Sequence, residues 1–164
     1  MSDEAGGEIA RHPNVLAVRD ALRAAGVEPR VRVLPQTAPT AAAAAEQLGC
    51  PVAAIANSLI FDADGAPLLV LTSGAHRVDT GKLAARLGVG QLRRASAAFV
   101  REHTGQVIGG VAPLGHPAPI RTLIDETLAG FPQVWAAAGH PHTVFPIEYG
   151  QLLAATGAQP VAVN

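Results

Sequence analysis

The sequence is poor in the residues on which disulfide frameworks and many metal centres depend. The 164-residue chain contains a single cysteine, Cys50, which excludes an internal disulfide and any multi-cysteine zinc site. Aromatic residues make up only 4% and charged residues 15% of the chain, whereas hydrophobic residues make up 49%. We therefore expect an ordered core built from alanine, valine, leucine and isoleucine.

The chain also lacks long apolar runs and a secretory signal. No apolar stretch approaches the roughly 20 residues that cross a bilayer, and the first ten residues, MSDEAGGEIA, are acidic and polar. These absences predict a soluble, cytoplasmic protein with no membrane partner. The length fits one domain over residues 1–164, and 17 glycines and 13 prolines predict many turns between short elements.

The net charge of −1 argues against strong nucleic-acid binding, but the charge is unevenly distributed. Residues 77–101 contain six basic side chains and one acidic side chain. This asymmetry allows a surface that faces phosphates, although a solvated helix face explains it equally well. The candidates for such a surface are Lys82, Arg86, Arg93 and Arg94.

Hydrophobic spacing and cap residues predict helices interleaved with strands. In the helix predicted within 12–27, we expect Val15, Leu16, Val18 and Leu22 to face inward. Further helices are predicted after capping residues Thr40, Asp79 or Thr80, and Ser96, and again over residues 148–157. Predicted strands include NSLIF and PLLVLTSG, joined as a hairpin by DADGA, and the segments RVRVLP, PIRTLIDETL, QVWAAAG, HTVFPI and QPVAV. This order predicts an α+β fold with a mixed, curved, barrel-like sheet flanked by short helices.

Familiar catalytic and metal-binding motifs are missing. His140 and His142 lie two residues apart and His116 is a possible third neighbour, but no HExxH motif or cysteine pair accompanies them. Ser73 is outside a GxSxG elbow, and Cys50 has no charged neighbour to activate it. Neither a GxGxxG nor a Walker loop occurs. We therefore expect no metal and no cofactor.

The segment GQVIGGVAPLGHPAP, residues 105–119, contains four glycines and three prolines but no acid, serine, threonine or cysteine. Glycine allows a backbone to approach a ligand closely, and proline holds the neighbouring carbonyls rigid. Such a loop can position a water molecule or a ligand hydroxyl with backbone groups alone. A tight structural connection between two parts of a sheet explains the composition equally well.

Several of these segments, in this order, resemble the YbaK/EbsC family of aminoacyl-tRNA deacylases, which is related to the editing domain of bacterial prolyl-tRNA synthetases. The resemblance is carried by IANSLIFDADGAPLLVLTSGAHRVDTGKLAARLG and TGQVIGGVAPLGH and extends over nearly the whole chain. It implies hydrolysis in trans of mischarged tRNA, commonly alanyl or cysteinyl esters of proline tRNA. The implied water is oriented by the ribose 2′-hydroxyl and by the loop backbone.

The resemblance also implies a set of site residues and partners. Catalytic positions in the loop are Gly109, Gly110 and Pro113, and substrate-binding positions are Asn57, Ser58, His76, Arg77, Gly115 and His116. The implied partners are the tRNA acceptor end and prolyl-tRNA synthetase. We expect the loop to border a pocket that also touches Asn57 or Ser58, and Gly110→Val to weaken hydrolysis strongly while leaving the fold largely intact.

One departure from the family pattern concerns charge. Members of the family usually have a lysine at the start of the central strand, and the resemblance implies that this lysine contacts the terminal phosphate of the substrate. This chain has Asn57 there, and its only lysine is Lys82. His76 or Arg77 is a candidate substitute cation. Two hypotheses follow: a trans-editing hydrolase, favoured by the intact glycine loop, and a non-catalytic module that binds an aminoacyl-adenosine-like ligand or a synthetase, favoured by Asn57.

Overall fold

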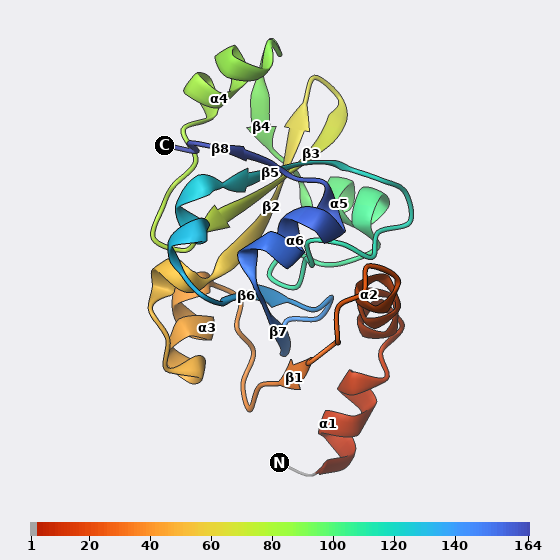
Figure 1. Cartoon of the computed structure of the whole chain (residues 1–164). Helices are drawn as coiled ribbons and strands as arrows, with labels where there is room; N and C mark the ends of the chain where they lie inside the picture. The colour runs from red at the N-terminus through yellow and green to blue at the C-terminus, as the bar shows by residue number, and fades with distance from the viewer. Residues whose placement is uncertain (1–2) are drawn as a thin grey trace.

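The strands form two sheets in the computed structural model, which describes residues 3–164 (Figure 1). The larger sheet has the order β4-β2-β3-β5-β8 and the smaller sheet the order β1-β7-β6. The strand bounds are Arg32–Val33 (β1), Ala56–Ala63 (β2), Ala66–Ser73 (β3), Leu92–Arg94 (β4), Arg121–Asp125 (β5), Val134–Ala137 (β6), Thr143–Ile147 (β7) and Gln159–Val161 (β8). Since β3, β5 and β8 run parallel and the other pairs antiparallel, the larger sheet is mixed. The α+β prediction is confirmed, with two sheets and no closed barrel within residues 3–164.

Six α-helices and two short 3₁₀ helices connect these strands in the described chain. The helix bounds are Asp3–Ala10 (α1), Pro13–Ala24 (α2), Ala41–Leu48 (α3), Thr80–Leu87 (α4), Ala97–Thr104 (α5), Tyr149–Thr156 (α6), Val52–Ala54 (η1) and Glu126–Gly130 (η2). The side chains of Thr40, Asp79 and Ser96 each accept a hydrogen bond from the N–H three residues later, as the sequence predicted. Helix α1 had no counterpart in the sequence-based prediction.

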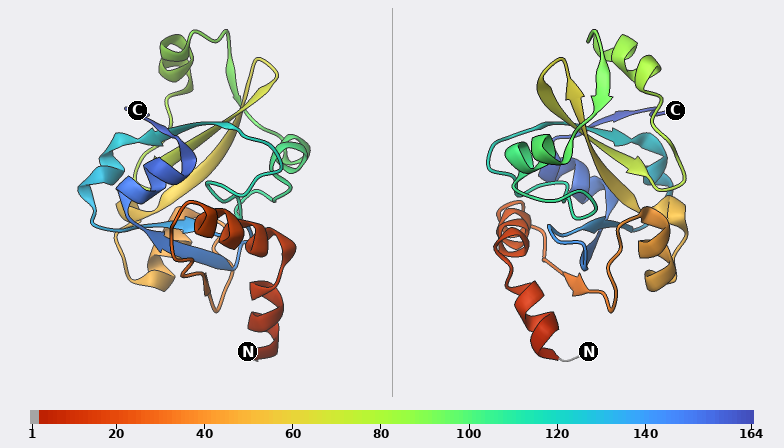
Figure 2. Two further views of the ribbon diagram at one scale, coloured as in Figure 1. Left: turned by 45° about the vertical axis from the view of Figure 1, so that its right-hand side comes forward. Right: turned by 180° about the vertical axis from the view of Figure 1, so that it is seen from behind.

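The β2–β3 hairpin forms the longest antiparallel pair and ends in the predicted turn. Asp64 and Gly65 have φ values of 52° and 94°, so both central residues of the turn lie in the left-handed region that a type I′ turn requires. The Asp62 carboxylate accepts a hydrogen bond from the Gly65 N–H at 2.7 Å. Figure 2 shows α4 and β4 near this hairpin, at the opposite end of the molecule from α1.

Two local predictions need correction. Leu16 is 44% exposed, whereas Val15, Val18 and Leu22 are fully buried, because a helix turns about 100° per residue and Leu16 lies outside their shared stripe. The strand predicted through PIRTLIDETL ends at Asp125. The Asp125 side chain accepts a hydrogen bond from the Thr127 N–H and thereby starts η2.

Half of β2 has an open edge, and this edge positions the candidate site. β4 pairs with β2 only over Phe61–Ala63, and the Ile60 carbonyl accepts from the Ala95 N–H just beyond that pairing. Backbone groups of successive residues in a strand point to opposite edges, so those of residues two apart point to the same edge. The N–H and C=O of Ser58 therefore point to the same side as those of Ile60, past the end of β4. None of the helices within residues 3–164 is long and apolar enough to cross a membrane.

Candidate active site at the open edge of β2

A cavity with two adjoining lobes lies beside the open edge of β2. The inner lobe, about 40 Å³, reaches under β6 and β7 to Trp135 and Thr143. The outer lobe, about 200 Å³, opens toward Arg94 and Ile108. The wall that the lobes share comes from three segments of the chain and consists of Pro39, Thr40, Ala41, Asn57, Ser58, Gly109 and Val111. The expectation that the loop borders a pocket that also touches Asn57 or Ser58 agrees with this geometry, through Gly109 and Val111.

Ser58 carries a hydroxyl group with no internal partner. Its Oγ is buried, yet it makes no hydrogen bond to any described residue. A buried, unpaired hydroxyl is costly, by about 1–3 kcal/mol, unless a ligand or water completes its hydrogen bonds. Asn57, the next residue along the same wall, makes no side-chain hydrogen bond to the residues described here either. The wall therefore offers two polar side chains that the fold itself leaves free.

Gly109 forms the corner of the turn that closes the cavity. The Gly110 N–H donates to the Val107 carbonyl at 2.9 Å, and Gly109, the third residue of this four-residue turn, has φ +91°. A turn with positive φ at this position favours glycine. A side chain here would also reach the Cα of Pro39 at 3.4 Å, across the cavity wall. Glycine at position 109 thus allows the positive φ of the turn and keeps a side chain out of the cavity.

Gly110 and Gly115 have a different reason to be glycine, because they pack directly against neighbouring backbone. A Cβ on Gly110 would lie 2.9 Å from the carbonyl carbon of His140 and from the nitrogen of Pro141. A Cβ on Gly115 would lie 3.1 Å from the Cα of Val18 in α2. The expectation that Gly110→Val leaves the fold intact is therefore wrong, since valine cannot fit without displacing this backbone.

Side chains brace the loop from inside. The buried Gln106 accepts a hydrogen bond from the Ala112 N–H at 2.8 Å, and His116 Nε2 donates to the Ala112 carbonyl at 2.8 Å. Burial lowers the pKa of His116, and its hydrogen bond to Ala112 opposes this shift only in part. A neutral imidazole that donates one hydrogen bond explains His116 as a support of the loop. Along with Pro113, which is buried, Gly115 and His116 line a separate hollow beside Ile120 and not the two-lobed cavity.

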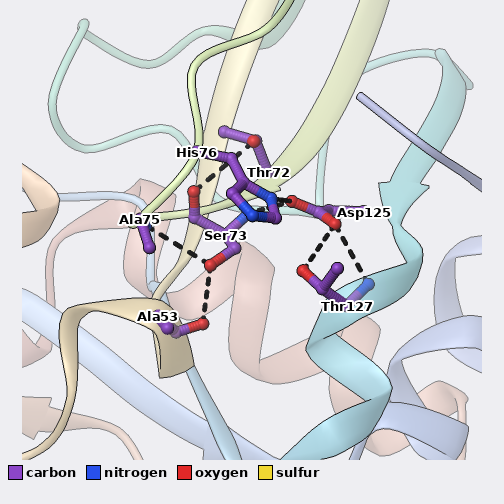
Figure 3. A network of polar contacts seen from close by, with 7 residues as sticks. All are labelled: Ala53, Thr72, Ser73, Ala75, His76, Asp125 and Thr127. Atoms are coloured by element: carbon purple, nitrogen blue, oxygen red, sulfur yellow. Dashed lines mark hydrogen bonds and ion pairs between the residues drawn. The ribbon is translucent and has the colours of Figure 1, made fainter. Parts of the chain in front are cut away.

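His76 lies in a polar network at the ends of β3 and β5, shown in Figure 3. Its Nδ1 donates to Asp125 at 2.7 Å, and the same carboxylate accepts from the Ser73 N–H and from the N–H and hydroxyl of Thr127. Burial alone would raise the pKa of Asp125, but the hydrogen bonds from Thr127, Ser73 and His76 lower it below the usual value. Ser73 Oγ donates to the Ala53 carbonyl at 2.8 Å.

These contacts make the network a structural clamp. The Ser73 hydroxyl is hydrogen-bonded to backbone, so the serine, histidine and aspartate here do not form a nucleophilic triad. None of the residues in the clamp lines either lobe of the cavity. Arg77, which follows His76 and is exposed, is also absent from both lobes. The geometry therefore gives no support to either residue as the substitute cation.

Among the basic candidates, Arg94 is the one that reaches the cavity. It is the only ionised residue that lines either lobe, and it forms no ion pair with the described side chains, residues 6–164. Arg93, its neighbour on β4, lines a separate hollow with Asp62 and Asp64. Lys82 and Arg86 are exposed on α4. Successive side chains of a strand point to opposite faces, which is why Arg93 and Arg94 line different hollows. The sequence analysis missed this difference because it did not predict residues 92–94 as a strand.

The histidines suggested by the sequence gather in part. The rings of His12 and His142 lie 5.4 Å and 5.7 Å from that of His140. Burial lowers the pKa of His140, and the neighbouring His12 and His142 lower it further. The Nδ1 of each ring contacts a backbone group. His12 Nδ1 accepts from the Asn14 N–H, His140 Nδ1 accepts from the His142 N–H, and His142 Nδ1 lies 3.1 Å from the Leu34 carbonyl oxygen. His116 is not part of this cluster. Within the described residues, no group of three side chains is arranged to hold a metal ion.

Known proteins share both the sequence pattern and the fold. Residues 35–155 match the model of the aminoacyl-tRNA editing domain. A solved structure provisionally described as a trans-editing enzyme for prolyl-tRNA synthetase is 41% identical, with a TM-score of 0.87 over 93% of this chain and 98% of that chain. The YwhH protein of Bacillus subtilis, whose function is uncharacterised, is 34% identical over 97 residues, which are 58% of this chain and 61% of YwhH.

Much longer proteins also contain a related segment. The proline–tRNA ligase of Lysinibacillus sphaericus is 33% identical over 74 residues, which are 45% of this chain but only 13% of the ligase. The similarity to that ligase thus concerns a small part of its length. The family match, in contrast, extends over most of the present chain. The chain belongs to the aminoacyl-tRNA editing domain family.

Proposed function

We propose that this protein is an aminoacyl-tRNA deacylase that acts in trans on proline tRNA carrying a small, incorrect amino acid. The observation that carries the proposal is the two-lobed cavity, whose wall combines the Gly109 turn with the unpaired hydroxyl of Ser58. Membership in the editing-domain family supports the reaction class. Similarity to a structure described as a trans-editing enzyme for prolyl-tRNA synthetase supports action in trans.

The size of the inner lobe supports a small acyl group such as alanyl, seryl or cysteinyl. Its volume of about 40 Å³ corresponds to roughly three water-sized spheres. Small residues on α3, β2 and β6 line much of it, including Ala44, Ala56 and Ala136. Such a lining distinguishes acyl groups mainly by size, and a hydrophobic pocket separates substrates that differ by one methylene by only about 1–3 kcal/mol.

Hydrolysis at this site would depend on positioned polar groups. The N–H groups of Gly109 and Val111 have no acceptor among the described residues, and both residues border the two lobes. With the Ser58 hydroxyl, they are donors for the ester carbonyl as negative charge develops on its oxygen. Water adds to the carbonyl carbon, the bond to the ribose oxygen breaks, and that oxygen regains a proton. The products are a free amino acid and an uncharged tRNA 3′ end.

The direct test is multiple-turnover deacylation of proline tRNA charged separately with alanine, serine, cysteine or proline. We expect release of at least one of the three small amino acids well above the rate without protein, and slower release of proline. Binding of charged tRNA without turnover would contradict the proposal and favour the non-catalytic binding module.

A variant of the turn separates a role in the site from backbone strain. Gly109→Ala places a Cβ at the cavity wall and imposes left-handed strain of about 1–2 kcal/mol. Gly157→Ala at the end of α6 imposes similar strain at φ +65°, where a Cβ meets nothing within 4 Å. We expect similar losses of stability in both variants and a loss of hydrolysis in Gly109→Ala alone. Equal activity in the two folded variants would remove the turn from the site.

A further inference from the structure

The N–H groups of the glycine loop alternate between bonded and open. The Gly110 N–H is hydrogen-bonded within its turn, and the Ala112 N–H donates to the side chain of Gln106. The N–H groups of Gly109 and Val111 have no acceptor among the described residues, and both residues border the two lobes. One set of N–H groups therefore holds the loop, and the other set is left open beside the cavity.

Side chains, in place of a neighbouring strand, fix the second half of the loop. Residues 110–114 are buried but belong to no helix or strand, and within residues 107–116 the described chain forms a single hydrogen bond between backbone groups. Buried backbone N–H and C=O groups need partners. The fully buried Ala112 receives both partners from side chains, Gln106 Oε1 for its N–H and His116 Nε2 for its carbonyl, each at 2.8 Å.

Gln106 is itself held in place by helix α5. It is only 1% exposed, and a buried amide is costly unless it is hydrogen-bonded. The Gln106 N–H donates to Thr104 Oγ1 at 3.0 Å, and the same hydroxyl donates to the Val100 carbonyl at 2.7 Å. Hydrogen bonds thus connect the last turn of α5, through Gln106, to Ala112, the residue that follows Val111.

We propose that Gln106 is a positioning residue for hydrolysis, which acts through Ala112 to hold the open N–H of Val111 beside the ester. This inference rests on the proposed function and deepens it, since it names the side chain that sets where the donors of the loop lie. Gln106 lines neither lobe, so it acts on the substrate only through the loop. Such an indirect effect is large, because a misplacement of about 1 Å costs about 100-fold in rate.

Two variants of Gln106 separate its hydrogen bond from its volume. Gln106→Met has a similar length but no strong acceptor, so the Ala112 N–H loses its partner. Gln106→Glu keeps an acceptor oxygen, and at about pH 6 burial keeps the new carboxyl group neutral.

A matched pair of threonines controls for lost stability. Thr104 and Thr156 end α5 and α6, and each hydroxyl donates to the carbonyl four residues earlier and accepts from the N–H two residues later. Thr104→Val removes the support of Gln106, whereas Thr156→Val removes the same two hydrogen bonds at a position that lines neither lobe. Circular dichroism and urea denaturation verify that each variant is folded.

Hydrogen exchange measured by NMR tests the contact, and single-turnover deacylation of alanyl-charged proline tRNA tests its consequence. The Ala112 N–H should exchange at least about tenfold faster in Gln106→Met than in the wild type or Gln106→Glu. The single-turnover rate constant should fall by about tenfold or more in Gln106→Met and by a smaller factor in Thr104→Val. Half-saturation should stay within about twofold of the wild type, because the lost contact serves the transition state. Gln106→Glu should regain most of the rate, and Thr156→Val should cleave as the wild type does.

A wild-type rate in folded Gln106→Met, or equal losses in Thr104→Val and Thr156→Val, would overturn the positioning role and leave the proposed function standing. Should Gln106→Met not fold, the two threonine variants decide alone. Failure of the proposed function gives a different result, since the wild type then hydrolyses none of the charged tRNAs, whatever the exchange rate of the Ala112 N–H.

Discussion

Two serines on the β2–β3 hairpin have opposite surroundings. Ser73 Oγ, at the end of β3, donates to the Ala53 carbonyl and accepts from the Ala75 N–H. Ser58 Oγ, on β2, is also buried but has no partner in the described chain, and its residue borders both lobes of the cavity. The hydroxyl of Ser73 is thus hydrogen-bonded within the fold, whereas that of Ser58 has no hydrogen-bond partner among the described residues.

The difference extends to the regions around the two serines. Around Ser73, the Asp125 carboxylate accepts hydrogen bonds from three residues, so this region uses its polar groups to hold strand ends together. Around Ser58, the Asn57 amide and the Arg94 guanidinium lack ion pairs or hydrogen bonds within the described residues. Polar groups that the fold satisfies serve stability, whereas those left open toward a cavity are available to a substrate.

The largest expected effect is on the fold, from Gly110→Val. Because a Cβ on Gly110 would lie 2.9 Å from backbone atoms of His140 and Pro141, valine should lower the free energy of unfolding by about 3 kcal/mol. Urea denaturation measures this change, and Gly130→Val, where a Cβ meets nothing within 4 Å, is the matched control. Equal stability of the two variants would show that the loop is not packed as described.

The second largest effect is expected from Asp125→Asn, which should lower the free energy of unfolding by about 2 kcal/mol. An amide cannot accept all the hydrogen bonds that the carboxylate accepts. Hydrolysis by the folded variant should be unchanged, since Asp125 lines neither lobe. The pKa of Asp125 is lowered by folding, so its contribution to stability is present above about pH 4 and is lost as the pH falls through the folded-state pKa.

Urea denaturation at roughly half-unit steps between about pH 2.5 and 7 measures how the Asp125 carboxylate contributes to the free energy of unfolding. The difference in free energy of unfolding between wild type and Asp125→Asn should be constant near neutral pH and shrink in acid. A difference that grows as the pH falls would contradict the clamp.

Asn57→Lys tests whether the open region lacks charge. The added lysine should lower the KM for alanyl-charged proline tRNA at low salt, because a charge-assisted hydrogen bond to the substrate replaces a neutral one, and the gain should shrink as added salt screens it. In the Arg94→Ala background, where the outer lobe has no other ionised side chain, the gain should be larger. An equal gain in both backgrounds would mean that Arg94 and the added lysine do not act on the same part of the substrate.

Much of the fold follows from local sequence signals. The DADGA turn, the caps at Thr40, Asp79 and Ser96, and the apolar stripe of α2 without Leu16 each have a short-range physical cause, and the structure confirms them. The end of β5 was missed because a buried Asp125 that caps η2 looks, in sequence, like a strand that continues. Hydrogen-bond donors to Asp125 include Ser73 on β3 and Thr127 on η2, and the contact with β3 joins residues far apart in the sequence.

The site was predictable in outline but not in detail. Asn57, Ser58 and Gly109 meet at one cavity, as expected, whereas Gly110 and Gly115 are required by packing against distant backbone at Pro141 and Val18. A glycine needed for close packing and a glycine needed at a ligand look alike in a sequence. Ile108 and the one arginine on the cavity side of β4 were likewise visible only after the strands were paired.

The two serines provide the most direct test of the central claim, that open polar groups at β2 act on substrate while satisfied ones at β3 act on the fold. Ser58→Ala and Ser73→Ala are compared by urea denaturation and by deacylation of alanyl-charged proline tRNA. Ser73→Ala should lose about 1 kcal/mol of stability and keep its hydrolytic rate, because two hydrogen bonds but no cavity contact are removed. Ser58→Ala should keep or slightly gain stability and lose about tenfold or more in kcat/KM. The opposite pattern, with Ser58→Ala unstable but fully active, would contradict the account.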